Sequence, residues 1–422
     1  MQLAFVFGRL PALSRLEIES VATTLPFQWS LTSVQPNILR LKPEGDWSTW
    51  SLLNAGFQSK ESQFLVEAID QMQRVLGGTV KIVYLDKQHD QQNVLPEAQK
   101  LVKGLQEGVT GKRTIGLSVY SKKVNPLRLG MSLKKNLRSE GSVRVVIPGE
   151  TGELSSAQIL HNNLPLTEGL AGLEVNVLEE GNKFWVGVTL SSQDIESYSK
   201  RDFQIPKPDP ISGMLPPKLA QTMINLAEKG KRLAVYDPFC GNGRIVMEAA
   251  LMNLTSYGSD IVPKKVESAT ENMAWLGQEF GAKVLPEHQF WVADATKPEV
   301  FSLLHANALS AQYVLVGEPF LGKPLRAQLT PSEVDAWLAD LLPLYEGFLN
   351  NWAPATVAKN VRPTRMLLVF PRAKVVDGTE AAVYEKLVDT IDRLGYDSKV
   401  HFTYDRPDSY VRRDLVSIEY RQ

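Results

Sequence analysis

The sequence predicts an α/β protein in which a mainly parallel sheet, flanked by helices, follows smaller α+β domains. One observation is the short apolar run 233–237, which ends on a carboxylate and leads through a glycine turn into helix-forming residues. A second is that two later predicted strands, 256–260 and 290–295, also carry an acid at their carboxyl ends. A third is that the first 84 residues follow the order βαββαβ, the ferredoxin-like arrangement. At 422 residues the chain is too long for a single core.

The N-terminal domain is predicted to cover residues 1–88. Its expected strands are 2–8, 27–31, 38–41 and 80–84, and its expected helices are 13–21 and 61–76. The second helix has apolar residues at helical spacing from Phe64 to Leu76, and Gly77 and Gly78 follow it. The ferredoxin-like fold serves many functions, so this domain alone indicates no activity.

A second domain is predicted for residues 89–192. Its expected helices are 95–107, 126–138 and 155–162, and its expected strands are 114–120, 143–147, 173–178 and 183–190. Nine basic residues and one acid, Glu140, fall between residues 112 and 144 of a chain whose net charge is −1. The basic residues are Lys112, Arg113, Lys122, Lys123, Arg128, Lys134, Lys135, Arg138 and Arg144. A solvated helix face normally mixes both signs, so this run favours a phosphate partner over a plain spacer domain.

The helix predicted at 126–138 should present a cationic outer face. Lys134 and Arg138 stand one turn apart, and Leu127 and Met131 stand one turn apart on a neighbouring side. The residues expected to contact nucleic acid are Lys122, Lys123, Lys134, Lys135 and Arg138. Residues 193–217 are predicted to be a linker stiffened by five prolines, and residues 218–422 form the sheet domain.

The sheet domain contains seven predicted strands. They are 233–237, 256–260, 290–295, 313–316, 365–370, 400–404 and 415–420. The turn Asp237–Arg244 follows the first strand, at the carboxyl edge where open α/β sheets hold their ligands. It meets neither the dinucleotide fingerprint nor the phosphate-loop pattern. Asp237 would repel a pyrophosphate but suits a ligand with a cationic amino-acid end, such as S-adenosylmethionine; an ordinary structural corner is the alternative.

Acids at the ends of the next two strands favour a nucleoside ligand. Asp260 can accept both hydroxyls of a ribose, the role that such an acid plays in nucleotide-binding sheets. Asp294 ends the third predicted strand. A single acid at a strand end would usually be a surface residue, but three in consecutive units indicate a site.

The motif Asp-Pro-Phe-Cys-Gly-Asn-Gly at 237–243 resembles the first motif of S-adenosylmethionine-dependent nucleic-acid methyltransferases, close to the RNA methylases that carry a THUMP domain. Residues 213–220 resemble the stretch before the first strand in that family. Residues 133–146 and the surrounding element order resemble the THUMP domain, which grips the acceptor end of tRNA in its family. The resemblance implies a Rossmann-like seven-stranded methyltransferase domain preceded by ferredoxin-like and THUMP-like α+β domains.

The same resemblance implies a cofactor site. In similar methyltransferases an acid at the position of Asp294 bonds the adenine amino group. The residues expected to bind S-adenosylmethionine are Leu215, Asp237, Pro238, Phe239, Gly241, Gly243, Asp260, Asp294 and Ala295. Cys240 is expected to pack inside the turn rather than act as a nucleophile, because no Pro-Cys pair follows the fourth strand.

The loop after the fourth strand, Gly317–Gly322, departs from the family's usual Asp/Asn-Pro-Pro-Tyr/Phe. Such a loop needs an acceptor for the exocyclic amine, a proline-fixed backbone and an aromatic face for stacking. In one register Glu318 takes the acid position and Leu321 replaces the aromatic residue; in the other Phe320 is the aromatic residue and Gly317 replaces the acid. The expected catalytic residues are Glu318 as acceptor by side chain or backbone carbonyl, Pro319, and Phe320 as stacking partner. A decayed catalytic loop is the alternative.

These features predict an enzyme that transfers a methyl group in line from a sulfonium to a base amino nitrogen. Most of the rate enhancement would come from holding the two reactants in line. By resemblance, guanine N2 in tRNA is the expected target. The alternatives are amino methylation of DNA or rRNA, and a tRNA-binding protein whose catalytic half is degenerate.

Composition predicts the compartment and excludes some chemistry. One cysteine allows no internal disulfide and fits a reducing compartment. Five scattered histidines predict no metal site. With no apolar run long enough to span a bilayer and no leader-like N-terminus, we expect a cytoplasmic protein without membrane contact, most simply a monomer. The modified nucleotide, the number of methyl groups, the activity of the 317–321 loop and the oligomeric state are left open.

Overall fold

The computed structural model describes residues 2–23, 29–44, 60–138, 141–209, 214–281, 285–306, 312–406 and 409–421, without the side chains of 60–65. The first part of the strand predicted at 27–31, the side chains of Phe64 and Leu65, and Glu140 and Gly213 lie outside the described residues. The chain divides into two compact units. One comprises Met1–Arg15 with Leu25–Ser197, and the other Leu16–Thr24 with Tyr198–Gln422.

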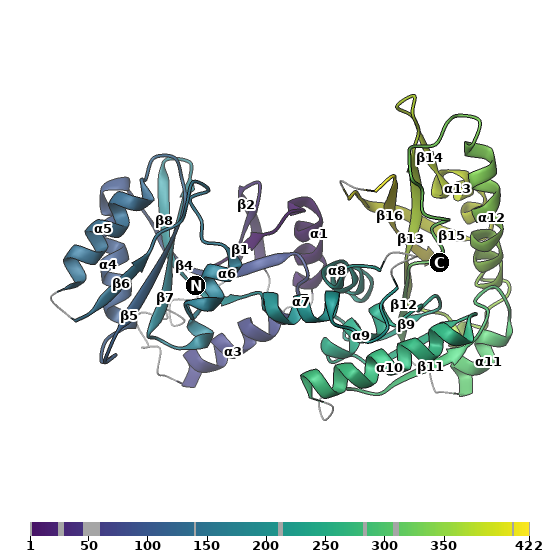
Figure 1. Cartoon of the computed structure of the whole chain (residues 1–422), viewed down its shortest axis with the longest axis horizontal. Helices are drawn as coiled ribbons and strands as arrows, with labels where there is room; N and C mark the ends of the chain where they lie inside the picture. Colours follow the sequence, from purple (N-terminus) through teal and green to yellow (C-terminus); the bar gives the residue numbers. More distant parts are fainter. Residues whose placement is uncertain are drawn as a thin grey trace. The chain divides into compact units, whose positions relative to one another are not determined.

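The first unit is built on one eight-stranded sheet with the order β2-β3-β1-β4-β8-β7-β5-β6 (Figure 1). Its strands are β1 (Gln2–Phe7), β2 (Trp29–Gln35), β3 (Ile38–Pro43), β4 (Thr79–His89), β5 (Arg113–Tyr120), β6 (Val143–Val146), β7 (Gly172–Glu180) and β8 (Lys183–Ser192). Its helices are α1 (Pro11–Ala22), part of which belongs to the other unit, α3 (Lys60–Val75), α4 (Val94–Leu105), α5 (Pro126–Leu137) and α6 (Ser156–His161). β5 is parallel to β6 and β7, and the other neighbouring pairs are antiparallel.

The elements β1 to β4 follow the predicted βαββαβ order and lie in the sheet as β2-β3-β1-β4. The sheet then continues without a break, because β4 pairs with β8 from Lys81, opposite Ser192, to His89, opposite Phe184. The boundary expected between residues 88 and 89 therefore falls at the end of a strand inside one continuous sheet. A pairing between strands about a hundred positions apart leaves no local pattern in the sequence.

A buried ion pair crosses the middle of this sheet. Lys81 on β4 and Glu174 on β7 are about 1% and 0% exposed, and Lys81 Nζ lies 2.5 Å from Glu174 Oε1. Hydroxyl groups satisfy the same carboxylate, since Ser118 Oγ donates to Oε1 and Thr189 Oγ1 donates to Oε2, each at 2.5 Å. The pair joins two strands that lie on either side of β8.

The second unit contains a sheet with the order β11-β10-β9-β12-β13-β16-β15, to which β14 adds beside β13. Its strands are β9 (Ala234–Asp237), β10 (Ser256–Asp260), β11 (His288–Val292), β12 (Tyr313–Gly317), β13 (Arg365–Lys374), β14 (Glu380–Ala382), β15 (Tyr396–Tyr404) and β16 (Val411–Tyr420). The strands from β11 to β13 are parallel, and β16 runs antiparallel to both of its neighbours. The predicted Rossmann-like sheet of seven strands is confirmed, and β14 is an addition.

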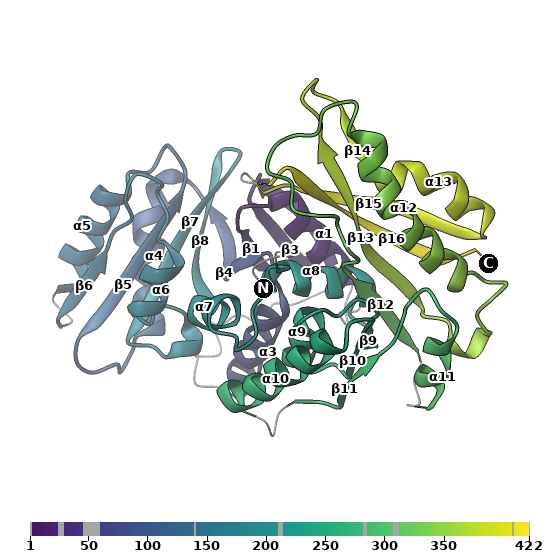
Figure 2. The same ribbon diagram turned by 45° about the vertical axis from the view of Figure 1, so that its right-hand side comes forward.

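Helices cover both faces of this sheet (Figure 2). They are α8 (Pro217–Glu228), α9 (Arg244–Leu251), α10 (Pro263–Phe280), α11 (Glu299–Ala306), α12 (Val334–Asn351) and α13 (Val383–Arg393). Residues of α9 and α10 form one apolar core with Cys240, and residues of α12 and α13 form another against β9, β12 and β13. The strand order reverses between β9, β10 and β12, which places a topological switch point at the carboxyl end of β9.

The segment predicted as a linker contains a helix, α7 (Ile195–Phe203). Asp194 Oδ1 accepts a hydrogen bond from the Ser197 backbone N–H at 2.9 Å, as at a helix start, and the prolines begin only at Pro206. Among the helices in the described parts of the chain, none is long and apolar enough to cross a membrane.

Candidate cofactor and catalytic site

The turn between β9 and α9 has a backbone that only glycine adopts without strain. Gly241 and Gly243 have φ angles of 51° and 88°. A Cβ atom on Gly243 would also lie 3.1 Å from the Ala269 side chain on α10. Gly243 is therefore needed for both conformation and close packing, whereas a Cβ atom on Gly241 would meet no atom within 4 Å.

Asp237 is a buried carboxylate at the mouth of this turn. It is 2% exposed, and its Oδ1 accepts a hydrogen bond from the Phe239 N–H at 3.0 Å. Burial raises its pKa well above the usual value; the charges of Asp260 and Glu318 raise it further, and the Phe239 N–H opposes the shift. Within the described residues no ion pair includes Asp237, and the groups that shift its pKa include no cation.

Asp260, at the end of β10, accepts hydrogen bonds from the β9–α9 turn and from its own loop. Its Oδ2 accepts from the Gly241 N–H at 3.0 Å, and its Oδ1 accepts from the Val262 N–H at 2.9 Å. A carboxylate has about four acceptor positions, so capacity for a ribose hydroxyl remains. Asp260 therefore shapes the turn that the glycines permit.

Asp294 lies two residues beyond β11, so the strand predicted to reach Ala295 ends earlier, at Val292. The Asp294 carboxylate starts a turn, because its Oδ1 accepts from the Thr296 N–H and hydroxyl at 2.9 and 2.7 Å. The Ala293 N–H donates to the Asp260 carbonyl at 3.0 Å and links this turn to β10. The structure thus brings Asp237 and Asp260 within electrostatic reach, with Asp294 on the next strand end.

The remaining expected cofactor residues are largely buried. Leu215 and Ala295 are buried, and the Ala295 carbonyl accepts bonds from Asn351 and Trp352 at 3.0 and 3.1 Å. Pro238 is buried, and the Phe239 ring packs against Phe348 with a centroid distance of 5.3 Å. These contacts attach Ala295 and Phe239 to α12 and to Trp352, the residue that follows it.

Cys240 is buried inside the turn. Burial raises the pKa of its thiol well above the usual value, and the charges of Asp237 and Asp260 add to the shift. A protonated, buried thiol agrees with the predicted packing role. Within the described residues no group of three or more His, Cys, Asp or Glu side chains could hold a metal ion.

Glu318 follows β12 directly and makes a contact that the sequence does not indicate. Its Oε1 accepts from Arg413 Nε at 2.5 Å, and the two side chains are 16% and 7% exposed. Phe320 is 50% exposed, with its carbonyl bonded by the Tyr345 hydroxyl at 3.3 Å, whereas Pro319 is buried. An aromatic face is thus available beside a fixed carboxylate.

Gly317, at the end of β12, lies close to the β9–α9 turn. A Cβ atom at this position would lie 3.2 Å from Asp237 Oδ1 and 3.4 Å from a ring carbon of Phe239. An acid at position 317 would therefore crowd Asp237. This geometry favours the register in which Glu318 supplies the acid of the loop.

The basic residues expected to contact nucleic acid all lie on the surface of the first unit. Lys122, Lys123, Lys134, Lys135 and Arg138 are exposed, and Lys123 pairs with Glu179. Arg113 is buried and donates to the Leu137 carbonyl at 3.5 Å, so it does not belong to the surface cluster.

The helix α5 differs from the expected division into an apolar and a cationic side. Leu127 and Met131 are 56% and 63% exposed. Its buried side is formed instead by Leu129, Leu133 and Leu137, spaced four residues apart. The exposed face of α5 is therefore both cationic and apolar.

Residues 207–308 match the family model described as "RMKL-like, methyltransferase domain". A tRNA (guanine(10)-N2)-dimethyltransferase of Pyrococcus abyssi is 33% identical over 123 residues, which cover 28% of this chain and 32% of the relative. A protein of the same name from Methanothermobacter thermautotrophicus is 42% identical over 65 residues, covering 15% and 19%. The matched parts thus span a third or less of these curated relatives.

Among solved structures, TrmN from Thermus thermophilus aligns over 99% of both chains at 16% identity, with a TM-score of 0.47. The family-model match at residues 207–308 includes the turn, Asp237, Asp260 and Asp294, so this part of the chain is similar to a methyltransferase domain.

Proposed function

We propose that this protein transfers a methyl group from S-adenosylmethionine to the exocyclic N2 of a guanine in tRNA. The observation that carries the proposal is the convergence of Asp237, Asp260 and Glu318 at the switch point of the sheet, beside the exposed ring of Phe320. The match of residues 207–308 to a methyltransferase domain supports the reaction class. The names of the relatives support guanine N2 and tRNA.

The proposed cofactor site uses each strand end for one part of the ligand. Asp237 would hold the cationic amino-acid end, Asp260 the ribose hydroxyls, and Asp294 with Ala295 the adenine. Leu215, Pro238, Phe239, Gly241 and Gly243 would form the walls and floor of the site. When bound, the sulfonium supplies an electrophilic methyl group. Burial of Asp237 without an ionic partner among the described residues supports this fit.

At the proposed catalytic loop, the chain's own groups hold the base. Phe320 would stack on the purine, Pro319 would fix the backbone, and Glu318 would accept a hydrogen bond from the amino group. The amino nitrogen would bond to the methyl carbon as the carbon–sulfur bond breaks, which leaves a neutral thioether, and the proton that the amino group loses would pass to solvent. Catalysis comes mainly from positioning.

We assign tRNA binding to the exposed basic side chains of the first unit, in a THUMP-like module spanning residues 89–192 after a ferredoxin-like module of residues 1–88. Lys122, Lys123, Lys134, Lys135 and Arg138 would contact phosphates. Leu127 and Met131 are also exposed on α5. A tRNA substrate would place the protein in the cytoplasm.

The test is methyl transfer by the purified full chain. Unmodified tRNA transcripts, rRNA and duplex DNA are incubated with isotope-labelled S-adenosylmethionine, and the nucleosides are analysed by mass spectrometry. We expect N2-methylguanosine or N2,N2-dimethylguanosine from tRNA alone. Label in DNA or rRNA would show the alternative amino methylation. tRNA binding without transfer would show a degenerate catalytic loop, an outcome that the departure of 317–321 from the family pattern makes worth testing.

A further inference from the structure

Arg413 is a buried cation at the candidate catalytic loop. It lies on β16, 95 residues from Glu318 in the sequence, and its Nε donates to Glu318 Oε1. Both side chains are largely buried. A charge-assisted hydrogen bond in such surroundings fixes geometry more firmly than a surface ion pair, whose energy is small.

The strand pairings show how Arg413 reaches the loop. Arg413 stands opposite Pro371 on β13, and Leu368 of β13 stands opposite Gly317 of β12. β13 therefore lies between Arg413 and the strand that precedes Glu318. The arginine side chain spans this strand to hold a carboxylate in an otherwise irregular loop.

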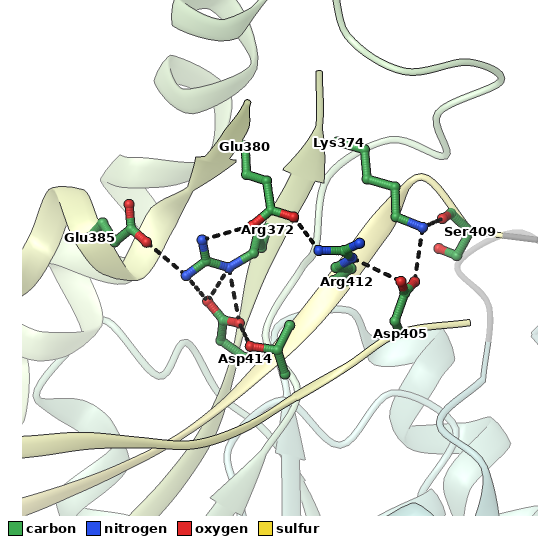
Figure 3. Close-up of polar contacts among 9 residues, drawn as sticks. Arg372, Lys374, Glu380, Glu385, Asp405, Ser409, Arg412 and Asp414 are labelled. Carbon is green, nitrogen blue, oxygen red and sulfur yellow. Dashed lines mark hydrogen bonds and ion pairs between the residues drawn. The ribbon is translucent and has the colours of Figure 1, made fainter. Parts of the chain in front are cut away.

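A charge network holds the other face of β16 (Figure 3). Successive side chains of a strand point to opposite faces, so Arg412 and Asp414 project away from the side that Arg413 uses. Asp414 accepts from Arg372 Nε at 3.2 and 3.0 Å and from Thr403 Oγ1 at 2.7 Å. These contacts join β13, β15 and β16.

The same charge network includes residues of β13, β14 and α13 (Figure 3). Arg412 pairs with Asp405 and Glu380, and Lys374 pairs with Asp405. Arg372 also pairs with Glu385 of α13 at 2.8 Å. Burial lowers the pKa of Arg372, but the hydrogen bond that it donates to Glu385 and the charge of Asp414 outweigh burial, so the pKa is raised. The start of β16 is thus fixed on one face while Arg413 projects from the other.

The geometry of Glu318 has a consequence for which base it can hold. A carboxylate only accepts hydrogen bonds. Guanine presents two adjacent donors, N1–H and the N2 amino group, whereas adenine presents one donor beside an acceptor. A carboxylate held in one orientation therefore fits the guanine edge and is repelled by the adenine N1 lone pair.

We propose that Arg413 is a positioning residue, which holds Glu318 so that its carboxylate meets the donor pair of guanine and rejects edges that carry an acceptor. The inference rests on the proposed function, and it assigns base selection to this buried pair.

The first experiment measures coupling between the two side chains. Methyl transfer to a tRNA transcript is measured for the wild type, Arg413→Gln, Glu318→Gln and the double variant. We expect Arg413→Gln to lower kcat by about 10²-fold, the lower end of the effect of a positioned catalytic group. KM for the transcript and the calorimetric affinity for S-adenosylmethionine should stay near the wild-type values.

The double variant should be no slower than Glu318→Gln, because Arg413 then has no carboxylate to position. Arg413→Lys should recover part of the lost kcat, and Arg393→Gln, a change on the exposed end of α13, is the matched surface control. Thermal melting confirms that each variant is folded. Losses that simply add in the double variant would overturn the proposal.

The second experiment measures selectivity. Once mass spectrometry has located the methylated guanine, that position is replaced by 2-aminopurine, which keeps the amino group but presents N1 as an acceptor. The wild type should strongly prefer guanine over 2-aminopurine. Glu318→Gln should weaken this preference because an amide both donates and accepts, and Arg413→Gln should weaken it because the Glu318 carboxylate is then no longer held in one orientation. If both variants keep the wild-type preference for guanine over 2-aminopurine, the inference is overturned and the proposed function stands. A wild type that methylates no tRNA would overturn the proposed function itself.

Discussion

The buried carboxylate of Asp237 lowers the stability of the folded protein, although we propose that it is needed to bind the cofactor. Its pKa is raised in the folded protein, so between the unfolded and folded pKa values the folded state binds more protons than the unfolded state. Stability therefore falls as the pH rises through that window and is lowest above it. A raised pKa of this kind is expected for a buried carboxylate that binds a cationic ligand.

We therefore expect Asp237→Asn to raise the melting temperature of the ligand-free protein at pH 7 by a few degrees. The amide keeps the acceptor for the Phe239 N–H and removes the buried charge. Adding S-adenosylmethionine should then give none of the further stabilisation that we expect in the wild type. The exposed change Asp389→Asn is the control. A lower melting temperature for the ligand-free variant would contradict this account.

Binding of the cofactor should release protons at pH values below the raised pKa of Asp237. A cation beside Asp237 favours the ionised carboxylate, so cofactor affinity should rise with pH until the raised pKa of the free protein is passed. Calorimetry in two buffers of different ionisation enthalpy counts the protons released. The release should vanish in Asp237→Asn, and an affinity that does not change with pH would argue against Asp237 as the cationic subsite.

At the scale of the element, the turn into α9 combines strain and crowding. Gly378, on the β13–β14 connection, has φ of 85° with no atom within 4 Å of a built Cβ, whereas Gly243 has φ of 88° and Ala269 at 3.1 Å. Gly378→Ala should cost about 1 kcal/mol from the left-handed backbone alone. Gly243→Ala should cost clearly more and weaken cofactor binding. Chemical denaturation of both variants gives the comparison, and equal losses would show that the packing against α10 is unimportant.

Helix α5 carries the proposed nucleic-acid contacts of the first unit. Replacing Lys134 and Lys135 together by alanine should weaken tRNA binding and reduce the salt dependence of log K by about 1 for each phosphate that is no longer neutralised. Binding is measured by filter retention between low and moderate salt. Lys386→Ala on the exposed face of α13 is the control. An unchanged salt slope would remove α5 from the interface.

The elements also show which structure can be predicted from sequence. The predicted strands 233–237, 256–260 and 313–316 agree with β9, β10 and β12 to within one residue, because each is set by local pattern. The helix α7 is not predicted, because the prolines beyond it make the whole segment resemble a linker. The predicted end of β11 is too late in the chain, since Asp294 starts a turn through its own side chain.

At the scale of the whole molecule, the interactions that escape prediction are long-range ones. Three strand-end acids can be found because parallel strands place their carboxyl ends at one edge. The Arg413–Glu318 pair and the β4–β8 pairing have no local signature, because their partners lie far apart in the chain. The same limit applies to α5, where only packing decides that Leu127 and Met131 stay exposed.

The buried pair Lys81–Glu174 should dominate the stability of the first unit. Lys81→Met leaves the Glu174 charge buried and uncompensated, which typically costs about 3–5 kcal/mol. Heating the full chain should show a large loss of stability, while the affinity of the second unit for S-adenosylmethionine stays unchanged. Loss of that affinity at a temperature where circular dichroism shows a folded chain would contradict the assignment of the cofactor site to the second unit alone.

The position of β16 between β13 and β15 has a kinetic consequence. Met366 pairs with Ile418, so this strand can be inserted only after the chain has closed a long loop, whereas β9, β10 and β11 form from consecutive strand–helix units. During refolding, the carboxylates that we propose bind the methyl donor can assemble early. Arg413, which positions Glu318, joins the sheet only with the β15–β16 hairpin. Binding of S-adenosylmethionine should therefore recover before methyl transfer does.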